Sequence, residues 1–357
     1  MSRLVILARS ILFLGLLLGP GQLWPEARTH AQEESPLPAA RTQYPLTIEN
    51  CGQTLTFERP PQRILATYQN VAEILVALGL TESIVGVTYG QTYPAPAGYE
   101  EEVNGLNWMV DESEPQAARE VVLSARPDFV LVAYPAYDLD ANAGYASEAD
   151  YASIGAQLFR ITDQCLSDAS SSTIETVYAD ILALGQIFDV QERAEDLVAT
   201  MRDQIAETQV AVADRPPVEV IFSGGATEEQ LTGPVDVYGA GLNADMIRLA
   251  GGHNLFGDGA ESYLSVNAEE FARQQADIFA LIDTDPPFYG PVSERANLLF
   301  TTFPEIPASR DKRFVAVDGA AYAAGIRIPE AIDVMARSFH PEAFPESNAT
   351  PAATAEG

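Results

Sequence analysis

Histidine, lysine and tryptophan are nearly absent from this chain. Its 357 residues include three histidines, two tryptophans and a single lysine, Lys312. Beyond residue 31 only His253 and His340 remain, and neither has a partner at the spacing of a metal-binding motif. The sequence therefore argues against a zinc or manganese site built from histidines, and we expect no metal ion held by the protein's own side chains.

Catalytic signatures are also missing. The sequence contains no G-x-S-x-G nucleophile motif, no Walker phosphate-binding loop and no G-x-G-x-x-G dinucleotide motif. Adjacent carboxylates such as Glu101 and Glu102 are expected in a chain with 51 acidic residues, and solvated surface charge explains them. We therefore predict that the protein is not an enzyme and has no intrinsic cofactor.

Positive charge is scarce as well. The formal net charge is −31 at pH 7, from 20 basic and 51 acidic residues. Such a surface repels a phosphate backbone, so no nucleic-acid partner is expected. An acidic surface keeps a protein soluble, and its field also favours a cationic ligand or a basic docking partner.

Only two cysteines occur, Cys51 and Cys165, and neither belongs to a C-x-x-C motif. An even pair in an exported protein indicates a structural disulfide, here closing a loop of more than 100 residues. Two unpaired buried thiols are the alternative.

No hydrophobic run is long enough for a typical membrane span, which needs roughly 20 apolar residues. The first residues instead follow the order of a secretory signal peptide: Arg3 and Arg9, an apolar run at 11–18, and a small-residue cleavage site at 29–31. An uncleaved anchor is the alternative. No cysteine near the leader offers a lipid anchor, so we predict a signal peptide at 1–31 and a free periplasmic protein.

The remainder of the chain reads as two α/β lobes. Apolar segments of strand length alternate with segments of helical periodicity, which predicts parallel sheets covered on both faces. Strands are expected at 46–57 (a hairpin), 63–67, 83–87, 128–133, 218–222, 277–283 and 313–317; helices are expected at 71–78, 119–125, 244–250, 268–275 and 329–338. Between the two series, residues 173–212 are helical almost throughout.

The second of these central helices, at 191–212, would be roughly 33 Å long at 1.5 Å per residue, which is enough to span two lobes. The predicted fold is therefore α/β, with two lobes whose central, mostly parallel sheets are bridged by a single long backbone helix. The expected divisions are a flexible tether at 32–43, an N-terminal lobe at 44–172, a helical segment at 173–215, a C-terminal lobe at 216–341 and a disordered tail at 342–357.

A weak internal repeat links the two lobes. Glu120 stands eight residues before Asp128, and Glu269 stands eight residues before Asp277, so each glutamate begins a helix that leads into a strand. An acid in a first helical turn usually only compensates the helix dipole. Its matched placement in both halves indicates a shared function.

Ligands of α/β lobes bind at the carboxyl ends of parallel strands. Tyrosine recurs after the predicted strands, as at Tyr137 and Tyr322, which suits an amphipathic cleft for a large, partly apolar, oxygen-rich ligand. Tyrosines that pack as lids on the core are the alternative. The predicted ligand-binding set is Tyr68, Gln69, Tyr89, Gln91, Trp108, Tyr134, Ser223, Tyr238, Tyr263 and Arg327.

Two members of this set have equally strong alternatives. Arg327 stands between a glycine and a proline that begins a helix, where a guanidinium could bind a carboxylate or phosphate of the ligand. A salt bridge to a nearby acid explains it as well. Trp108 could form a wall of the cleft or occupy the core.

Four stretches together carry a family resemblance: "YPLTIENCGQTLTFERPPQRILATYQNVAEILVALGL", "ARPDFVLV", "LAGGHNLF" and "GIRIPEAIDVMARSFHPEAF". Over residues 44–342 the chain resembles the periplasmic binding proteins of ABC importers for ferric siderophores, cobalamin and related compounds. The resemblance implies little lobe motion on binding, and it implies that Glu120 and Glu269 dock into arginine pockets of the permease. It also favours a Cys51–Cys165 disulfide and Arg327 as a ligand contact. The chain has Tyr263 where many relatives carry tryptophan, and Ala276 where proline is usual.

We therefore expect a monomeric receptor that captures a ferric siderophore or similar Fe(III) chelate and presents it to an ABC permease and its ATPase. A corrinoid, haem or deazaflavin precursor is the alternative ligand. Two other classes remain open: a chelatase-like α/β enzyme and a secreted interaction module that holds no small molecule. An enzyme would place a constellation of histidines or carboxylates at the cleft, whereas an interaction module would fill the cleft with side chains.

Overall fold

The computed structural model describes residues 41–110, 116–166, 168–224, 234–283 and 290–345. The predicted signal peptide, most of the predicted tether and most of the predicted tail lie outside these residues. In the part of the chain that the structure describes, no helix is both long and apolar enough to cross a membrane.

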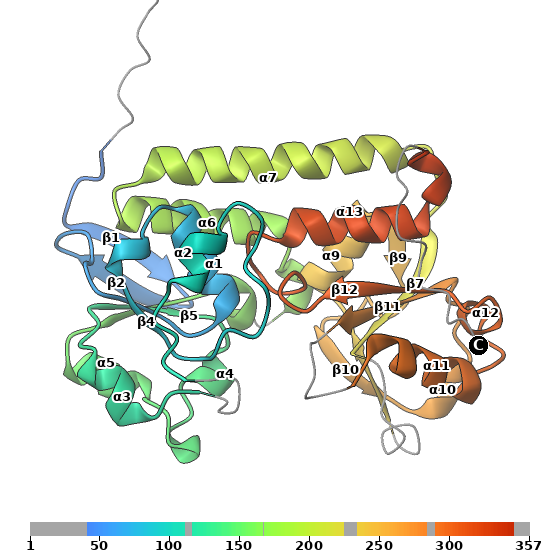
Figure 1. Cartoon of the computed structure of the whole chain (residues 1–357), viewed down its shortest axis with the longest axis horizontal. Coiled ribbons are helices and arrows are strands. Elements are labelled where there is room, and N and C mark those ends of the chain that lie inside the picture. Colours follow the sequence, from blue (N-terminus) through green and yellow to red (C-terminus); the bar gives the residue numbers. More distant parts are fainter. Residues whose placement is uncertain (1–40, 111–115, 167, 225–233, 284–289, 346–357) are drawn as a thin grey trace, which may run out of the picture. The chain divides into compact units, whose positions relative to one another are not determined.

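The N-terminal lobe is built on a four-stranded sheet in the order β4-β3-β5-β6, in which all neighbouring strands are parallel (Figure 1). Every residue of β5 is buried, as expected for an apolar run between two layers of helices. The strands are β3 (Ile64–Ala66), β4 (Ile84–Val87), β5 (Phe129–Val132) and β6 (Gln157–Arg160). Four longer helices of this lobe are α1 (Gln69–Ala77), α2 (Glu100–Asn104), α3 (Arg119–Ser124) and α5 (Glu148–Ser153).

An antiparallel hairpin of β1 (Leu46–Asn50) and β2 (Gln53–Phe57) precedes this sheet. Its two-residue turn is Cys51–Gly52, with φ of 53° and 75°. Such turns need positive φ at both positions, which suits glycine. Asn50 then ties the hairpin to the sheet: its side-chain amide donates to the carbonyl of Arg160 at 2.9 Å and its Oδ1 accepts from the backbone N–H of Arg160 at 2.8 Å.

The C-terminal lobe contains a six-stranded mixed sheet in the order β10-β8-β7-β11-β12, with β9 paired to β7. The strands β7, β9, β11 and β12 run parallel, whereas β8 and β10 are antiparallel additions that the sequence analysis did not foresee. The strands are β7 (Val218–Ser223), β8 (Val235–Tyr238), β9 (Gly252–Asn254), β10 (Tyr263–Val266), β11 (Ile278–Asp283) and β12 (Phe314–Asp318). The helices around them include α9 (Leu242–Leu249), α10 (Ala268–Ala272), α11 (Val292–Thr302), α12 (Pro307–Arg310) and α13 (Ile328–Phe339).

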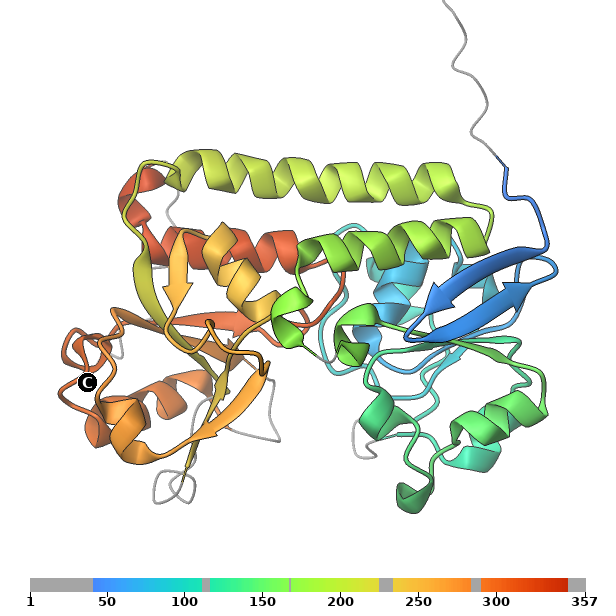
Figure 2. The ribbon, with the colours of Figure 1, turned by 180° about the vertical axis from the view of Figure 1, so that it is seen from behind.

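The predicted backbone helix is α7, which spans Gln191–Val212 with the expected bounds. It packs against α6 (Ile174–Ile187) on the side of the N-terminal lobe and against α13 on the side of the C-terminal lobe (Figures 1 and 2). Val198, Met201 and Ile205 form part of its buried stripe. These residues belong to a hydrophobic cluster with members in both lobes, so α7 joins the lobes through continuous apolar packing.

Residues 41 and 42 of the predicted tether bind the junction between α6 and α7. The Arg41 guanidinium pairs with Asp189 at 2.6 Å, and the backbone N–H of Thr42 donates to the same carboxylate at 2.8 Å. The end of the tether and the start of the tail are therefore parts of the folded body, since Phe344 also packs beneath Arg337, 4.6 Å from its guanidinium carbon.

Cys51 and Cys165 form a disulfide, as expected. The bond joins the hairpin turn to the segment after β6, and the two cysteines lie 114 residues apart in sequence. It therefore fixes the position of the first turn after β6, at the end of the sheet where ligands bind in this class of fold.

We predict that removing the disulfide lowers the free energy of unfolding by about 2–5 kcal/mol, because a long loop in the unfolded chain loses its constraint. The suitable variant is Cys51→Asn with Cys165→Ser, since asparagine tolerates the positive φ of the turn. Urea denaturation of variant and wild type measures the difference. Equal midpoints, or free thiols in the wild type by non-reducing mass spectrometry, would contradict the prediction.

Candidate ligand-binding site

A cavity of about 440 Å³ lies between the lobes, and loops of both lobes line it. The N-terminal lobe contributes residues that follow β5 and β6, including Tyr134 and Asp163. The C-terminal lobe contributes Tyr238, the last residue of β8, and residues that follow β12, including Tyr322. The carboxyl ends of strands in both lobes thus converge on one space, as the strand-end argument predicted.

Tyrosine dominates the aromatic surface of this cavity. Tyr134, Tyr137, Tyr238, Tyr263 and Tyr322 all line it, and Tyr137 and Tyr263 are 70% and 52% exposed. Tyr263 begins β10 directly opposite Tyr238 at the end of β8, so their ring centroids lie 5.5 Å apart. The centroid of Tyr322 lies 5.8 Å from that of Tyr238. The result is a connected aromatic surface with two rings open to solvent.

Tyr68 and Tyr89 lie behind this surface in the N-terminal lobe. The ring of Tyr68 meets that of Tyr134 edge to face at 5.4 Å and that of Tyr89 at 4.9 Å. Burial raises the pKa of the Tyr134 hydroxyl well above its ordinary value, and burial likewise raises the pKa of Tyr68. These phenols therefore stay neutral at physiological pH and act through apolar faces and uncharged hydroxyls.

Four buried oxygen atoms of the lining have no hydrogen-bond partner among the described residues: Asn70 Oδ1, Asp163 Oδ1, Ser172 Oγ and Asn243 Oδ1. The orientation of the Asn70 amide is set, because its Nδ2 donates to the carbonyl of Ala324 at 2.7 Å. Buried acceptors in native proteins are usually paired, so this concentration marks a place where a bound molecule or water supplies the donors.

One acid, Asp163, lines the cavity, and a second acid, Asp180, lies buried beside it. Burial raises the pKa of Asp163 to about 6, although Gln164 donates to its other oxygen at 3.1 Å. Burial also raises the pKa of Asp180 to about 7, and the neighbouring Asp163 adds to this. Asp180 accepts from the backbone N–H of Thr162 at 2.8 Å and from the Thr162 hydroxyl at 2.5 Å, which holds the turn that carries Asp163. None of the described residues that line the cavity is arginine, lysine or histidine.

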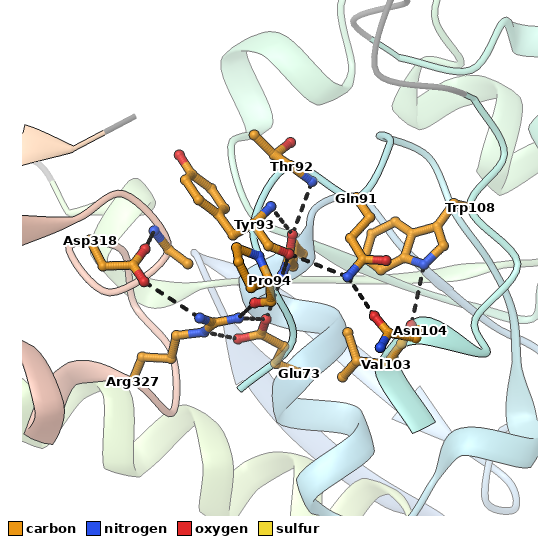
Figure 3. A network of polar contacts seen from close by, with 12 residues as sticks. Glu73, Gln91, Thr92, Tyr93, Pro94, Val103, Asn104, Trp108, Asp318 and Arg327 are labelled. Atoms are coloured by element: carbon orange, nitrogen blue, oxygen red, sulfur yellow. Dashed lines mark hydrogen bonds and ion pairs between the residues drawn. The ribbon is translucent and has the colours of Figure 1, made fainter. Parts of the chain in front are cut away.

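Gln69 and Gln91 do not line this cavity, in contrast to the sequence-based expectation. Gln69 Oε1 accepts from the backbone N–H groups of Thr92 and Tyr93 at 3.1 and 3.0 Å. The side-chain amide of Gln91 donates to Asn104 at 2.8 Å (Figure 3). Both glutamines follow predicted strands, but they hold the loop after β4 in place instead of facing the space between the lobes.

Trp108 and Ser223 also differ from the expectation. The Trp108 indole N–H donates to the carbonyl of Val103 at 3.2 Å, and the ring packs on the core of its lobe (Figure 3). Ser223 is fully buried in the last position of β7, where its hydroxyl donates to the carbonyl of Asp236 at 2.7 Å. The unforeseen strand β8 lies beside β7 and covers Ser223.

Arg327 binds an acid of the other lobe and is absent from the cavity lining. Its guanidinium forms a two-point contact with Glu73 of α1, with N···O distances of 2.8 and 2.5 Å, and it also donates to the carbonyl of Pro94 at 2.6 Å (Figure 3). The side chains of Arg327 and Glu73 are only 6% and 1% exposed. Of the two sequence-based interpretations, the salt bridge is the one that the structure contains.

Sequence reasoning missed several residues of the cavity for identifiable reasons. Asp163 follows β6, whose sequence Gln-Leu-Phe-Arg has only two apolar residues and so lacks the apolar run by which β5 was recognised. Asn243 lies in the first turn of α9, after the positive φ of Gly241, and Ser172 precedes α6. The signals that were available were the aspartate after a short apolar run and the glycine-rich loop before α9.

Glu120 and Glu269 have matching environments at their helix starts. Their side chains are 79% and 83% exposed, and each lies near one arginine: Arg119 at 3.6 Å and Arg273 at 2.9 Å. Each of the helices α3 and α10 lies on the side of its own lobe that is turned away from α7 (Figures 1 and 2). Both carboxylates are therefore accessible to a partner.

The model of the periplasmic binding protein family matches residues 64–283, which run from β3 to β11 and make up more than half of the chain. The chain belongs to the periplasmic binding protein family. It is therefore a binding protein and not an enzyme.

Curated relatives agree with this family. The uncharacterized ABC transporter substrate-binding lipoprotein YvrC of Bacillus subtilis is 24% identical over 310 residues, covering 85% of this chain and 88% of its own length. A cobalamin-binding protein of Halobacterium salinarum is 25% identical over 243 residues, and this match covers 66% of the chain and 58% of the relative.

Solved structures share the fold. A periplasmic binding protein from Veillonella parvula superposes with a TM-score of 0.71 at 18% identity, covering 83% of this chain and 97% of the other. A protein of an ABC-type Fe3+-hydroxamate transport system from Saccharomonospora viridis gives a TM-score of 0.69 at 23% identity, with 83% and 99% covered. At these identities the similarity concerns the two-lobed architecture.

We predict that Arg327→Met lowers the free energy of unfolding by about 3 kcal/mol, because it leaves the Glu73 carboxylate buried without its partner. The double variant Glu73→Gln with Arg327→Met should recover part of this loss. Chemical denaturation measures both. If Arg327→Met keeps wild-type stability but abolishes ligand binding, then Arg327 is a ligand contact and its pair with Glu73 does not stabilise the fold.

Proposed function

We propose that this protein is the substrate-binding component of an ABC importer and that it captures a ferric siderophore or similar iron chelate in the interlobe cavity. The observation that carries the proposal is the cavity itself: about 440 Å³, lined by five tyrosines and contributed by both lobes. Its size and its mixed apolar and polar lining suit a compact organic ligand. A ligand that spans the cavity would contact both halves of the protein at once.

We infer that the metal enters the cavity already coordinated by an organic chelator. Among the residues that the structure describes, no group of three or more His, Cys, Asp or Glu side chains could hold a metal ion. The aromatic surface around Tyr238 instead suits the apolar exterior of a complex whose metal is already coordinated. Iron is thus cargo, and the protein's part is to recognise the chelate.

A corrinoid is the second candidate ligand. The observation that favours it is the match to a cobalamin-binding protein over 243 residues. A macrocycle could stack on the exposed tyrosine rings at the cavity mouth, so the two ligand classes must be separated by experiment.

Delivery requires a partner in the membrane, and we propose that Glu120 and Glu269 dock on the permease of the importer, whose ATPase drives transport. Each carboxylate is more than three-quarters exposed and lies in the first turn of a short helix on its own lobe. One contact on each lobe would let the permease act on both halves of the receptor. The signal peptide expected at 1–31 would place the receptor outside the cytoplasm. We also expect the receptor to act as a monomer.

Titration with a panel of ferric siderophores should quench the tyrosine emission of the wild type and give a saturable isotherm, because Tyr134, Tyr238 and Tyr263 line the cavity. The variant Tyr238→Ala with Tyr263→Ala should bind about tenfold or more weakly, since two aromatic contacts are lost. Tyr178→Phe, on α6 outside the lining, serves as the control. A flat response to every ferric compound would reject the iron chelate as ligand.

Charge reversal of both docking residues, Glu120→Lys with Glu269→Lys, should abolish ligand uptake by cells while the dissociation constant of the purified protein stays unchanged. The matched control reverses two exposed acids of α7, Glu195→Lys with Asp203→Lys, and should transport normally. Loss of ligand affinity in the first variant, or equal loss of uptake in the control, would count against docking at these positions.

A further inference from the structure

We propose that the interlobe cavity selects ligands whose buried face is rich in hydrogen-bond donors, such as amide or amine N–H groups, and excludes ligands that place a carboxylate or phosphate there. This inference rests on the proposed function, since it names the class of substrate that the same cavity takes. Within each class of compound, ferric or corrinoid, the rule ranks ligands by the hydrogen-bonding groups at their edges and not by the metal that they carry.

Buried oxygen atoms of the lining require hydrogen-bond donors from the ligand. Asn70 is 3% exposed, and its Oδ1 has no partner among the described residues. The Ser172 hydroxyl is equally buried and also has no partner among them, but it can donate as well as accept. The Asn70 amide cannot reverse without losing the bond from its Nδ2 to the carbonyl of Ala324. Its oxygen, not its nitrogen, is therefore the atom left for a ligand, and a ligand must bring the donor.

Asp163 and Asn243 extend this set from opposite lobes. Oδ1 of each is buried and has no partner among the described residues. Asp163 lies in the turn after β6, which the disulfide at Cys165 and the bonds from Thr162 to Asp180 hold in place. The Asp163 carboxylate and the Asn243 amide thus line the cavity from opposite lobes, and a ligand with donors along two edges could bond to both.

The charge of the lining disfavours anionic ligands. The lining contains one acid, Asp163, and no arginine, lysine or histidine among its described residues. The nearby arginine of the interlobe contact, Arg327, is already committed to Glu73 and to the carbonyl of Pro94. An anionic group in the cavity would therefore meet a carboxylate and buried acceptors with no cation to compensate it, which disfavours binding.

The test uses two scaffolds, each with matched edges. The first is a linear ferric trihydroxamate with its terminal amine free, N-acetylated or N-succinylated, so that the edge is cationic, neutral or anionic around one ferric core. The second is a corrinoid that carries amide side chains or the corresponding carboxylates. Isothermal titration at pH 8, where Asp163 is ionised, gives the dissociation constants for the full chain.

We expect the amine or amide member of each scaffold that binds to bind at least about tenfold more tightly than the carboxylate member, since hydrogen bonds to charged groups are worth about one to two decades in affinity. Asp163→Asn should weaken binding of the free-amine chelate and leave the N-acetyl chelate nearly unchanged. Asp311→Asn, an exposed acid of the C-terminal lobe, is the matched control and should change neither. Asn243→Lys, which adds a cation to the lining, should reverse the preference.

The outcomes distinguish the two proposals. If no ferric compound binds but the corrinoid pair shows the preference, iron is not the cargo and the donor rule stands. If a ferric chelate binds with equal affinity whichever edge it carries, the iron chelate stands and the donor rule is wrong. A carboxylate member that binds more tightly in either scaffold also overturns the rule, and binding of no compound at all rejects both.

Discussion

The contact between Arg327 and Glu73 is the constraint on which the relation of the two lobes depends. One side chain lies at the start of α13 in the C-terminal lobe and the other in α1 of the N-terminal lobe, and both are almost completely buried. Two charges removed from water must remain together, because either one alone would be costly. Gln69 donates to the same Glu73 carboxylate at 2.8 Å, so the pair also organises the loop after β4. The continuous apolar packing of α7 acts in the same direction.

Arginines and tyrosines have different roles in this structure. Two of the scarce cations are buried in structural ion pairs: Arg327 joins the lobes, and Arg160 binds Glu148 at 2.6 Å beside the hairpin. No cation is left among the described residues of the cavity lining, which is formed by tyrosine rings and by oxygen atoms. The low number of basic residues thus accounts both for the strongly negative net charge and for the lack of a cation among the described residues of the cavity lining.

Regular elements of the fold followed from the sequence, whereas the cavity followed only in part. The length of α7 and the buried run of β5 are local patterns, so periodicity alone predicted them. Tyr134, Tyr238 and Tyr263 were found because strand ends converge in this class of fold. Gln69, Ser223 and Arg327 satisfy the same rule, but each bonds to a residue of another segment that periodicity does not identify: Gln69 to Tyr93, Ser223 to Asp236, and Arg327 to Glu73, which is 254 positions away. The strands β6 and β8 have too few apolar residues to be recognised from periodicity, and Asp163 was missed with β6.

A receptor whose halves are held by α7 and by a buried ion pair has little freedom to open by itself. A ligand that enters without a large rearrangement also leaves by the same route, so its residence time depends on the contacts within the cavity and not on opening of the lobes. If the permease docks at Glu120 and Glu269 as proposed, it has one contact on each lobe, and separating the lobes would require breaking the buried contact between Arg327 and Glu73. The stability of the interlobe contact would set the least force that this step demands.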